Sequence, residues 1–182
     1  ILTKKKKELH AKVARTIEDT YKEDICYHYG VLANHCMACE DYEKCAEYSS
    51  LAGRIAEKTA SFNDAIEYGK KRVTALERLL LTDEVNKQII DARTALGLYM
   101  AQMHYFVEAK EVIDPIIDLA IRNDYKKRLC QLYVILGTHN YVVEENYPEA
   151  FKTYEKALKI SGEVKDIIST VLASTWLGVA FG

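Results

Sequence analysis

The spacing of apolar residues constrains the fold of this chain more than any other feature, because they recur every three or four positions almost from end to end. Side chains at that spacing share one face of an α-helix, whereas a half-buried strand needs strict alternation, which no segment keeps. Only 8 glycines and 2 prolines interrupt the 182 residues, so the helices should be long. The sequence therefore predicts an all-α chain.

Short connections with helix-end chemistry separate the predicted helices. Residues 61–64 (SFND) predict a capping box, Thr82 a second helix start, Gly162 a helix end, and Pro148 lies in a first turn. Pro115 falls inside an apolar stripe that continues beyond it, so we expect a kinked helix there. About nine helices are expected, near residues 4–21, 23–39, 41–59, 62–80, 83–103, 106–122, 124–144, 147–161 and 163–181.

The helices repeat a pair of residues, Leu-Gly or its small equivalent, in which a large residue stands beside one with almost no side chain. The pairs are Leu32-Ala33, Ala52-Gly53, Leu96-Gly97, Leu136-Gly137 and Leu177-Gly178. An aromatic residue begins the following helix and a small residue comes three positions later: Tyr42 with Cys45, Phe62 with Ala65, Phe106 with Ala109, and Tyr147 with Ala150. Small residues at these positions allow two helix backbones to approach closely.

Four segments resemble the tetratricopeptide repeat: DYEKCAEYSSLA (41–52), SFNDAIEY (61–68), YFVEAKEVIDPI (105–116) and NYPEAFKTYEKAL (146–158). The resemblance implies a right-handed superhelical α-solenoid of antiparallel helix pairs over 23–182, preceded by a lead-in helix at 1–22. The last Leu-Gly pairs are 40 and 41 residues apart, longer than the usual repeat of about 34, which indicates longer helices. The helix at 41–59 is expected to close one helical hairpin and to open the next.

Arrays of this kind bind peptides or helices in a groove lined by the first helix of each pair, so we expect a protein or peptide partner. The residues expected to face the groove are Asn34, Met37, Arg54, Lys58, Asp91, Thr94, Leu98, Gln102, Gln131, Thr138 and Tyr141. That these residues are merely solvated is an equally open alternative. Some family members hold a C-terminal carboxylate with a lysine and an asparagine one turn apart, a clamp that the matching positions here lack.

The N-terminal part, including LHAKVARTIEDTY (9–21), is similar to the helical region that follows the NTPase module in bacterial multidomain regulators. Class III adenylate or guanylate cyclases and signalling ATPases are among them. This resemblance implies a non-catalytic regulatory or scaffold segment whose partners include other domains of its own chain. Because the sequence starts at Ile1 and stops at Gly182 within a helical pattern, it is expected to be a piece of a larger protein. No catalytic residue or cofactor is expected.

Charge and composition exclude several partners. A net charge of -2 and a pI of about 6.3 create no field that would attract nucleic acid. No apolar run approaches the length of a membrane span, and no signal peptide is recognisable. With an odd number of cysteines, the protein is expected to be cytoplasmic and reduced.

The segment HCMACEDYEKC (35–45) places three of the five cysteines close together. In the repeat register, Cys36 and Cys45 occupy positions where other repeats carry alanine or methionine, which predicts thiols that act as small buried side chains. The alternative function is a zinc-binding helical domain, with Cys36 and Cys39 on one helix face and His35 or Cys45 completing the site. We favour small size, since a chain of this length builds a core without a metal.

Overall fold

The computed structural model describes residues 2–181, so Ile1 and Gly182, the outer limits of the predicted domains, lie outside it. All regular elements in that range are helical, which confirms the prediction of an all-α chain. The elements are α1 (Leu2–Thr20), the 3-10 helix η1 (Ile25–His28), α2 (Tyr29–Cys39), α3 (Tyr42–Lys58), α4 (Phe62–Leu76), α5 (Asp83–Gln102), α6 (Phe106–Arg122), α7 (Lys126–Val142), α8 (Tyr147–Val164) and α9 (Ile167–Phe181).

Two of the predicted helix starts are confirmed and one cap is wrong. The Thr82 hydroxyl accepts a hydrogen bond from the Val85 amide at 3.2 Å, and Pro148 lies in the first turn of α8. The predicted capping box fails because the Ser61 side chain caps no amide of α4. Its hydroxyl instead accepts a hydrogen bond from Thr59 at 3.3 Å. Helix α6 continues through Pro115, as the apolar stripe predicted.

Three predicted boundaries differ from the structure. The helix expected from residue 23 begins at Tyr29, because residues 25–28 form the tighter turn η1. Helix α4 ends at Leu76 rather than at 80, and Leu80 is 85% exposed in the connection that follows. Gly162 does not end α8, which runs to Val164 and stops where Lys165 takes a left-handed φ of 56°.

One turn geometry recurs at five helix ends. A residue with positive φ is followed by an amide that donates to a carbonyl five positions earlier, the pattern of a Schellman motif. The bonds are Asp41 to Cys36 at 2.9 Å, Ser61 to Ala56 at 2.8 Å, Tyr105 to Met100 at 2.9 Å, Tyr125 to Ala120 at 3.0 Å and Asp166 to Ser161 at 2.9 Å. All five acceptor residues are buried. The sequence repeat therefore corresponds to a repeat in the backbone.

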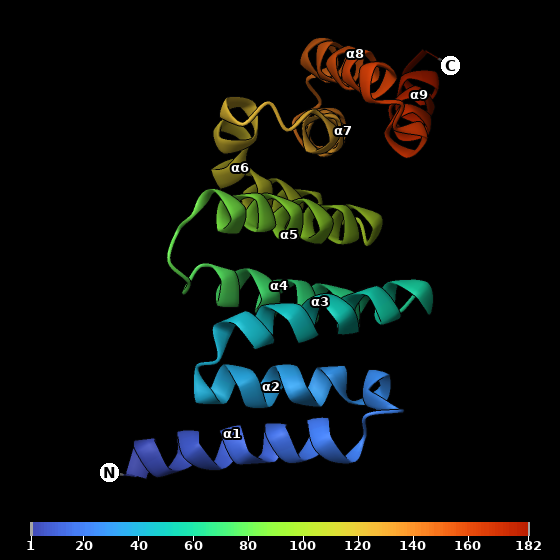
Figure 1. The fold of residues 1–182 in the computed structure, drawn as a ribbon. Coiled ribbons are helices and arrows are strands. Elements are labelled where there is room, and N and C mark those ends of the chain that lie inside the picture. Colours follow the sequence, from blue (N-terminus) through green and yellow to red (C-terminus); the bar gives the residue numbers. More distant parts are fainter. Residues whose placement is uncertain (1, 182) are drawn as a thin grey trace. The chain divides into compact units, whose positions relative to one another are not determined.

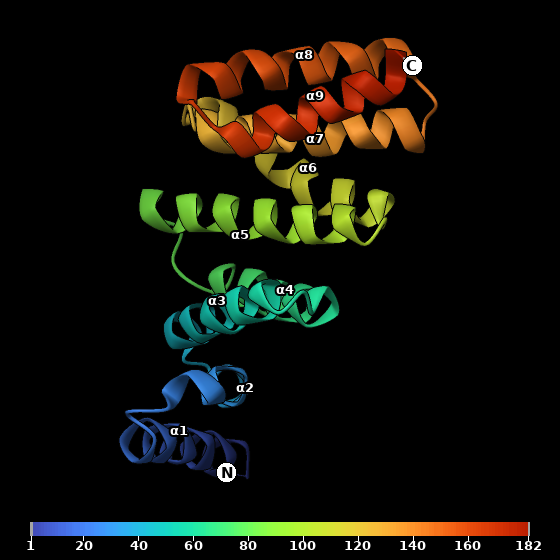
Figure 2. The same cartoon turned by 90° about the vertical axis from the view of Figure 1, so that its right-hand side faces the viewer.

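The chain divides into two compact units, Ile1–Ala92 and Arg93–Gly182, with the division inside α5. In the first unit, α1 packs on α2, α2 on α3 and α3 on α4, with successive helices running in opposite directions (Figure 1). In the second unit, α6 packs on α7, and α7, α8 and α9 pack on one another (Figure 2). Within each unit the helices therefore stack on their neighbours in sequence, as in an α-solenoid.

The small residues of the repeat lie where helices meet, except Gly178, which is exposed and where an added Cβ atom would have no neighbour within 4 Å. Cys45, Ala65, Ala109 and Ala150 are all 0% exposed. A Cβ atom added at Gly137 would lie 2.6 Å from Cε1 of Tyr154, and one added at Gly97 would lie 2.8 Å from Cγ2 of Ile113. These contacts confirm that small side chains allow the helices to approach. Every helix within residues 2–181 is too short or too polar to cross a membrane.

Candidate functional site

Helix α3 is the helix around which the first unit is built, and its three faces have different roles. One face is buried in the core and consists of Cys45, Ser49, Ala52 and Ala56. A second face carries Lys44 and Tyr48 toward α1. The third face opens into a cleft and consists of Glu43, Glu47, Ser50 and Arg54, which follow one another at helical spacing.

The second face is held by the carboxylate of Glu18 in α1. That carboxylate accepts hydrogen bonds from Lys44 Nζ at 2.7 Å and from Tyr48 Oη at 2.6 Å. Burial acts to raise the pKa of Glu18, but the hydrogen bonds from Lys44 and Tyr48 outweigh it, so the pKa is lowered. Burial and the same carboxylate raise the pKa of Tyr48. The predicted lead-in helix is thus anchored to α3 as well as to α2.

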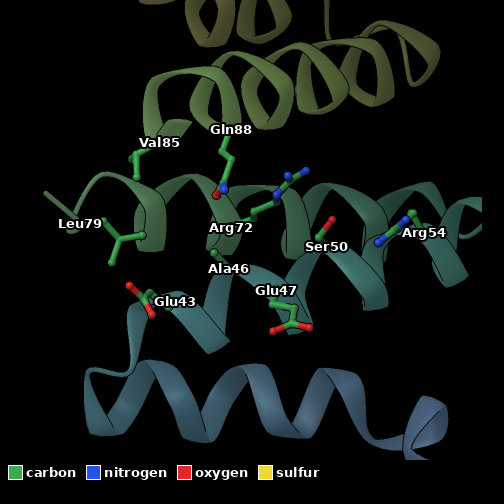
Figure 3. A pocket seen from close by; sticks show the side chains of 9 residues that line it. All are labelled: Glu43, Ala46, Glu47, Ser50, Arg54, Arg72, Leu79, Val85 and Gln88. Carbon is green, nitrogen blue, oxygen red and sulfur yellow. The ribbon is translucent and has the colours of Figure 1, made fainter. Parts of the chain in front are cut away.

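The cleft on the third face has a volume of about 500 Å³ and is called here the α3–α5 cleft. Its lining residues are Glu43, Ala46, Glu47, Ser50 and Arg54 of α3, Arg72 of α4, Leu79 of the following connection, and Val85 and Gln88 of α5. All belong to the first unit. Figure 3 shows Leu79 and Val85 near Glu43 at one end, and Arg54 at the other.

Three charged side chains of the α3–α5 cleft are open to a ligand. Within residues 2–181, Glu43, Glu47 and Arg54 have no hydrogen bond or ion pair from their side chains. All three are exposed, whereas Ala46 behind them is buried. The cleft therefore combines carboxylates and an apolar wall at one end with a guanidinium at the other.

A second cleft flanks α3 on the side of its C-terminal half and is called here the tyrosine cleft. It has a volume of about 450 Å³. Its lining residues are Cys26, Tyr27, Tyr29, Gly30, Ala52, Ile55, Ala56, Thr59, Ser61, Asp64 and Tyr68. Three tyrosines thus meet around it, and Asp64 carries its one charge among those residues.

The cysteines of residues 35–45 lie in or beside the core. Cys36 is 1% exposed and Cys45 is 0% exposed, as expected for residues that replace alanine. Burial above all, with smaller effects from Asp41 and Cys39, raises the pKa of Cys36 to about 12. Cys39 donates a hydrogen bond to the Cys36 carbonyl at 3.4 Å. In the part of the chain that the structure describes, no three His, Cys, Asp or Glu side chains are grouped so that they could hold a metal ion.

Of the residues predicted to line a groove, Arg54 lines the α3–α5 cleft. Lys58 is exposed one turn further along α3, and Asn34 accepts a hydrogen bond from Lys71 of α4. The other residues with solvent access are Met37, Asp91, Leu98, Gln131 and Tyr141, which are half-buried, and Gln102, which is exposed. The side chain of Gln131 accepts a hydrogen bond from Arg128 at 2.9 Å.

Two of the predicted groove residues are wrong because they are buried. Thr94 is 0% exposed and Thr138 is 3% exposed. The Thr138 hydroxyl donates to the Val134 carbonyl at 2.9 Å and accepts a hydrogen bond from Tyr154 at 3.2 Å. Its polar group is satisfied inside the second unit, so neither threonine is available to a ligand.

Most residues of the α3–α5 cleft were not predicted from the sequence. Glu43, Glu47 and Ser50 share the helical spacing of Arg54, so this stripe could have been found by extending the pattern toward the start of α3. Leu79 carried no such signal, because it was assigned to a helix that in fact ends at Leu76.

No family model matches the chain, and no curated protein matches it at a significant level.

Proposed function

We propose that this chain is a non-catalytic, protein-binding module and that the α3–α5 cleft holds a polypeptide segment of its partner. The observation that carries the proposal is the set of three charged α3 side chains, Glu43, Glu47 and Arg54, that line the cleft without an ion pair in the described part of the chain. Charged side chains without an ion pair are hydrated, and a partner with opposite charges can replace the bound water.

The order of side chains along the cleft defines the chemistry of the segment. Glu47 and Arg54 are seven positions apart on α3, which separates them by about 10 Å along the helix axis. An extended peptide advances about 3.3 Å per residue, so a basic and an acidic side chain roughly three residues apart match the two sites. Leu79 and Val85 beside Glu43 provide room for an apolar side chain next to the basic one.

The proposal extends to the biological setting implied by the sequence. A tetratricopeptide-like array stacked as in a solenoid suits a regulatory scaffold, and the resemblance to bacterial multidomain regulators suggests a cytoplasmic signalling protein of the cyclase or ATPase type. Within such a protein, the first partners to test are other domains of the same parent chain. Those domains should be searched for an exposed segment with the charge order described above.

The binding test uses a fluorescent peptide of extended sequence with an apolar residue next to a lysine and a glutamate three positions after the lysine. Fluorescence anisotropy should show saturable binding to the protein. The variant Arg54→Glu should weaken binding on the order of tenfold, because the substitution replaces an attraction with a repulsion. Lys58→Glu is the matched control, since this lysine lies on the same helix but does not line the cleft.

A second peptide, in which lysine replaces the glutamate, distinguishes a specific contact from general electrostatics. It should bind Arg54→Glu more tightly than it binds the unaltered protein. The proposal fails if Arg54→Glu and Lys58→Glu have the same effect, or if a peptide without charges binds as tightly as the charged one.

A further inference from the structure

The tyrosine cleft is separate from the α3–α5 cleft, because the two share no lining residue. Its walls come from η1 and the start of α2, the C-terminal half of α3, and the N-terminal part of α4. The whole cleft lies within the first unit. Its ligand chemistry can therefore be argued independently of the proposed peptide site.

Tyr27 is the most unusual residue of this cleft, because its large aromatic side chain is 82% exposed at the rim. Burial of a large aromatic ring usually stabilises a fold, so an exposed ring at the rim of a cleft indicates a contact with a ligand. Tyr29 lies two positions later and stacks on Tyr48, with ring centroids 5.9 Å apart. One ring is thus held in place, while another is open to solvent.

Tyr68 enters the cleft from α4 and lies against the backbone of Gly30. A Cβ atom at Gly30 would overlap the Tyr68 hydroxyl, so glycine leaves room for this ring in its observed position. The Tyr68 ring already receives one cation, because Lys71 Nζ lies 5.5 Å from its centroid. Burial, followed by the charges of Asp64 and Glu67, raises the pKa of Tyr68, so the field of Asp64 reaches this ring.

The charge of the cleft is complementary to a cation. Asp64 is the one charged residue of its lining, is exposed, and has no hydrogen bond or ion pair from its carboxylate within residues 2–181. Aromatic rings attract cations through the negative potential of their faces, and quaternary ammonium groups are recognised by clusters of such rings. An anion would meet a carboxylate and three electron-rich rings there.

We propose that the tyrosine cleft binds an alkylated ammonium group, with Tyr27, Tyr29 and Tyr68 contacting its alkyl surface and Asp64 neutralising its charge. An alkylated ammonium is preferred over a bare one because its methyl groups bury apolar surface against the rings and against Ile55 and Ala52. The group can come from a methylated lysine of a polypeptide or from a free quaternary ammonium compound.

The experiment titrates the protein with three probes by calorimetry or by chemical-shift changes of labelled tyrosine. The probes are trimethyllysine with both ends blocked, its neutral analogue in which carbon replaces the ammonium nitrogen, and tetramethylammonium. The blocked trimethyllysine should bind roughly tenfold more tightly than the neutral analogue, which has the same shape and no charge. Tighter binding of trimethyllysine than of tetramethylammonium identifies a modified polypeptide as the source, and equal binding identifies a free cation.

Two variants of exposed residues, Tyr27→Leu and Asp64→Asn, should each weaken binding of trimethyllysine severalfold while leaving the melting temperature unchanged. Tyr105→Leu and Asp118→Asn are matched controls at exposed positions outside the cleft and should bind as the unaltered protein does. The proposal is overturned if neither cation binds saturably, if the neutral analogue binds as tightly, or if the controls lose as much affinity as the cleft variants.

Discussion

At the scale of single residues, small side chains decide where the helices of the second unit meet. Gly137 of α7 lies under the ring of Tyr154 from α8, which is 0% exposed. The ring cannot turn away, because its hydroxyl donates to Thr138 at 3.2 Å and because burial leaves it no space. Close packing of this kind explains why the Leu-Gly pair is part of the repeat.

Gly137→Ala should therefore destabilise the protein by about 1–3 kcal/mol, because the added methyl group would overlap the Tyr154 ring. Gly162→Ala is the matched control in the same unit. Gly162 is exposed on α8, and a Cβ atom there would have no neighbour within 4 Å. That substitution should stabilise the protein by up to about 1 kcal/mol, because alanine favours the helix.

Urea unfolding followed by circular dichroism measures both changes. Equal effects of the two substitutions would mean that helix propensity alone matters and that the Gly137 contact is unimportant. The same measurement applied to Ala150→Leu should show a loss of similar size to that of Gly137→Ala, because Ala150 is 0% exposed.

At the scale of secondary-structure elements, the helix ends are unusual because none of the residues with positive φ is a glycine within the described chain. Six non-glycine residues take this conformation, each directly after a helix or close to its end. Alanine and charged residues are strained there, since the Cβ atom crowds the backbone. Helix ends in this protein therefore lack the glycine signal that sequence analysis relies on, which is why Gly162 was misread.

Ala60→Gly should stabilise the protein by about 1 kcal/mol, because Ala60 has a φ of 56° and is exposed, so the substitution removes strain without loss of packing. A gain of that size should raise the melting temperature by roughly 2–4 °C in a chain of this length. Ala11→Gly, inside α1, is the opposite control and should lower the melting temperature. A lower melting temperature for Ala60→Gly would show that Ala60 is not strained at this turn.

The contact between α1 and α2 contains a pair of histidines, and these make the packing of the two helices sensitive to pH. Nδ1 of His10 and Nδ1 of His35 are 2.8 Å apart, a distance at which one nitrogen must donate and the other accept. Burial, followed by the charge of His10, lowers the pKa of His35. A second proton on the pair would remove the acceptor and place two positive charges in contact.

The pKa of His35 is lower in the folded state than its ordinary value of about 6.5. Between these two pKa values, the unfolded chain therefore binds more protons than the folded protein does. The stability contribution of the pair is therefore complete above that pH and is lost as the pH falls from about 6.5 toward the folded pKa. Urea midpoints measured between pH 5 and 8 should decline over this window, and His35→Gln should flatten the decline. His104→Asn, an exposed position in the second unit, should leave the decline unchanged.

At the scale of the whole molecule, the sequence predicted the helices well and the open surface poorly. The burial of Cys45 and Ala150 followed from their place in the repeat. The same register placed Thr94 and Thr138 on a surface, although both are buried. A repeat register that is wrong by one residue turns the predicted face of a helix by about 100°. That error leaves most core positions recognisable, but it moves residues between a groove and the interior.

The all-α fold could be predicted because it depends on interactions between residues that are close in the sequence. Apolar spacing, scarce glycine and proline, and small residues at fixed positions act within a few turns of chain, and together they specify an all-α protein whose helices pack closely on their neighbours. The polar stripe on α3 can be seen in its helical spacing, but only the folded chain shows that this stripe lines a cleft. Glu43, Glu47 and Arg54 line a cleft because Leu79, Val85 and Gln88 lie opposite them, and no pattern within α3 encodes the position of residues from later parts of the chain.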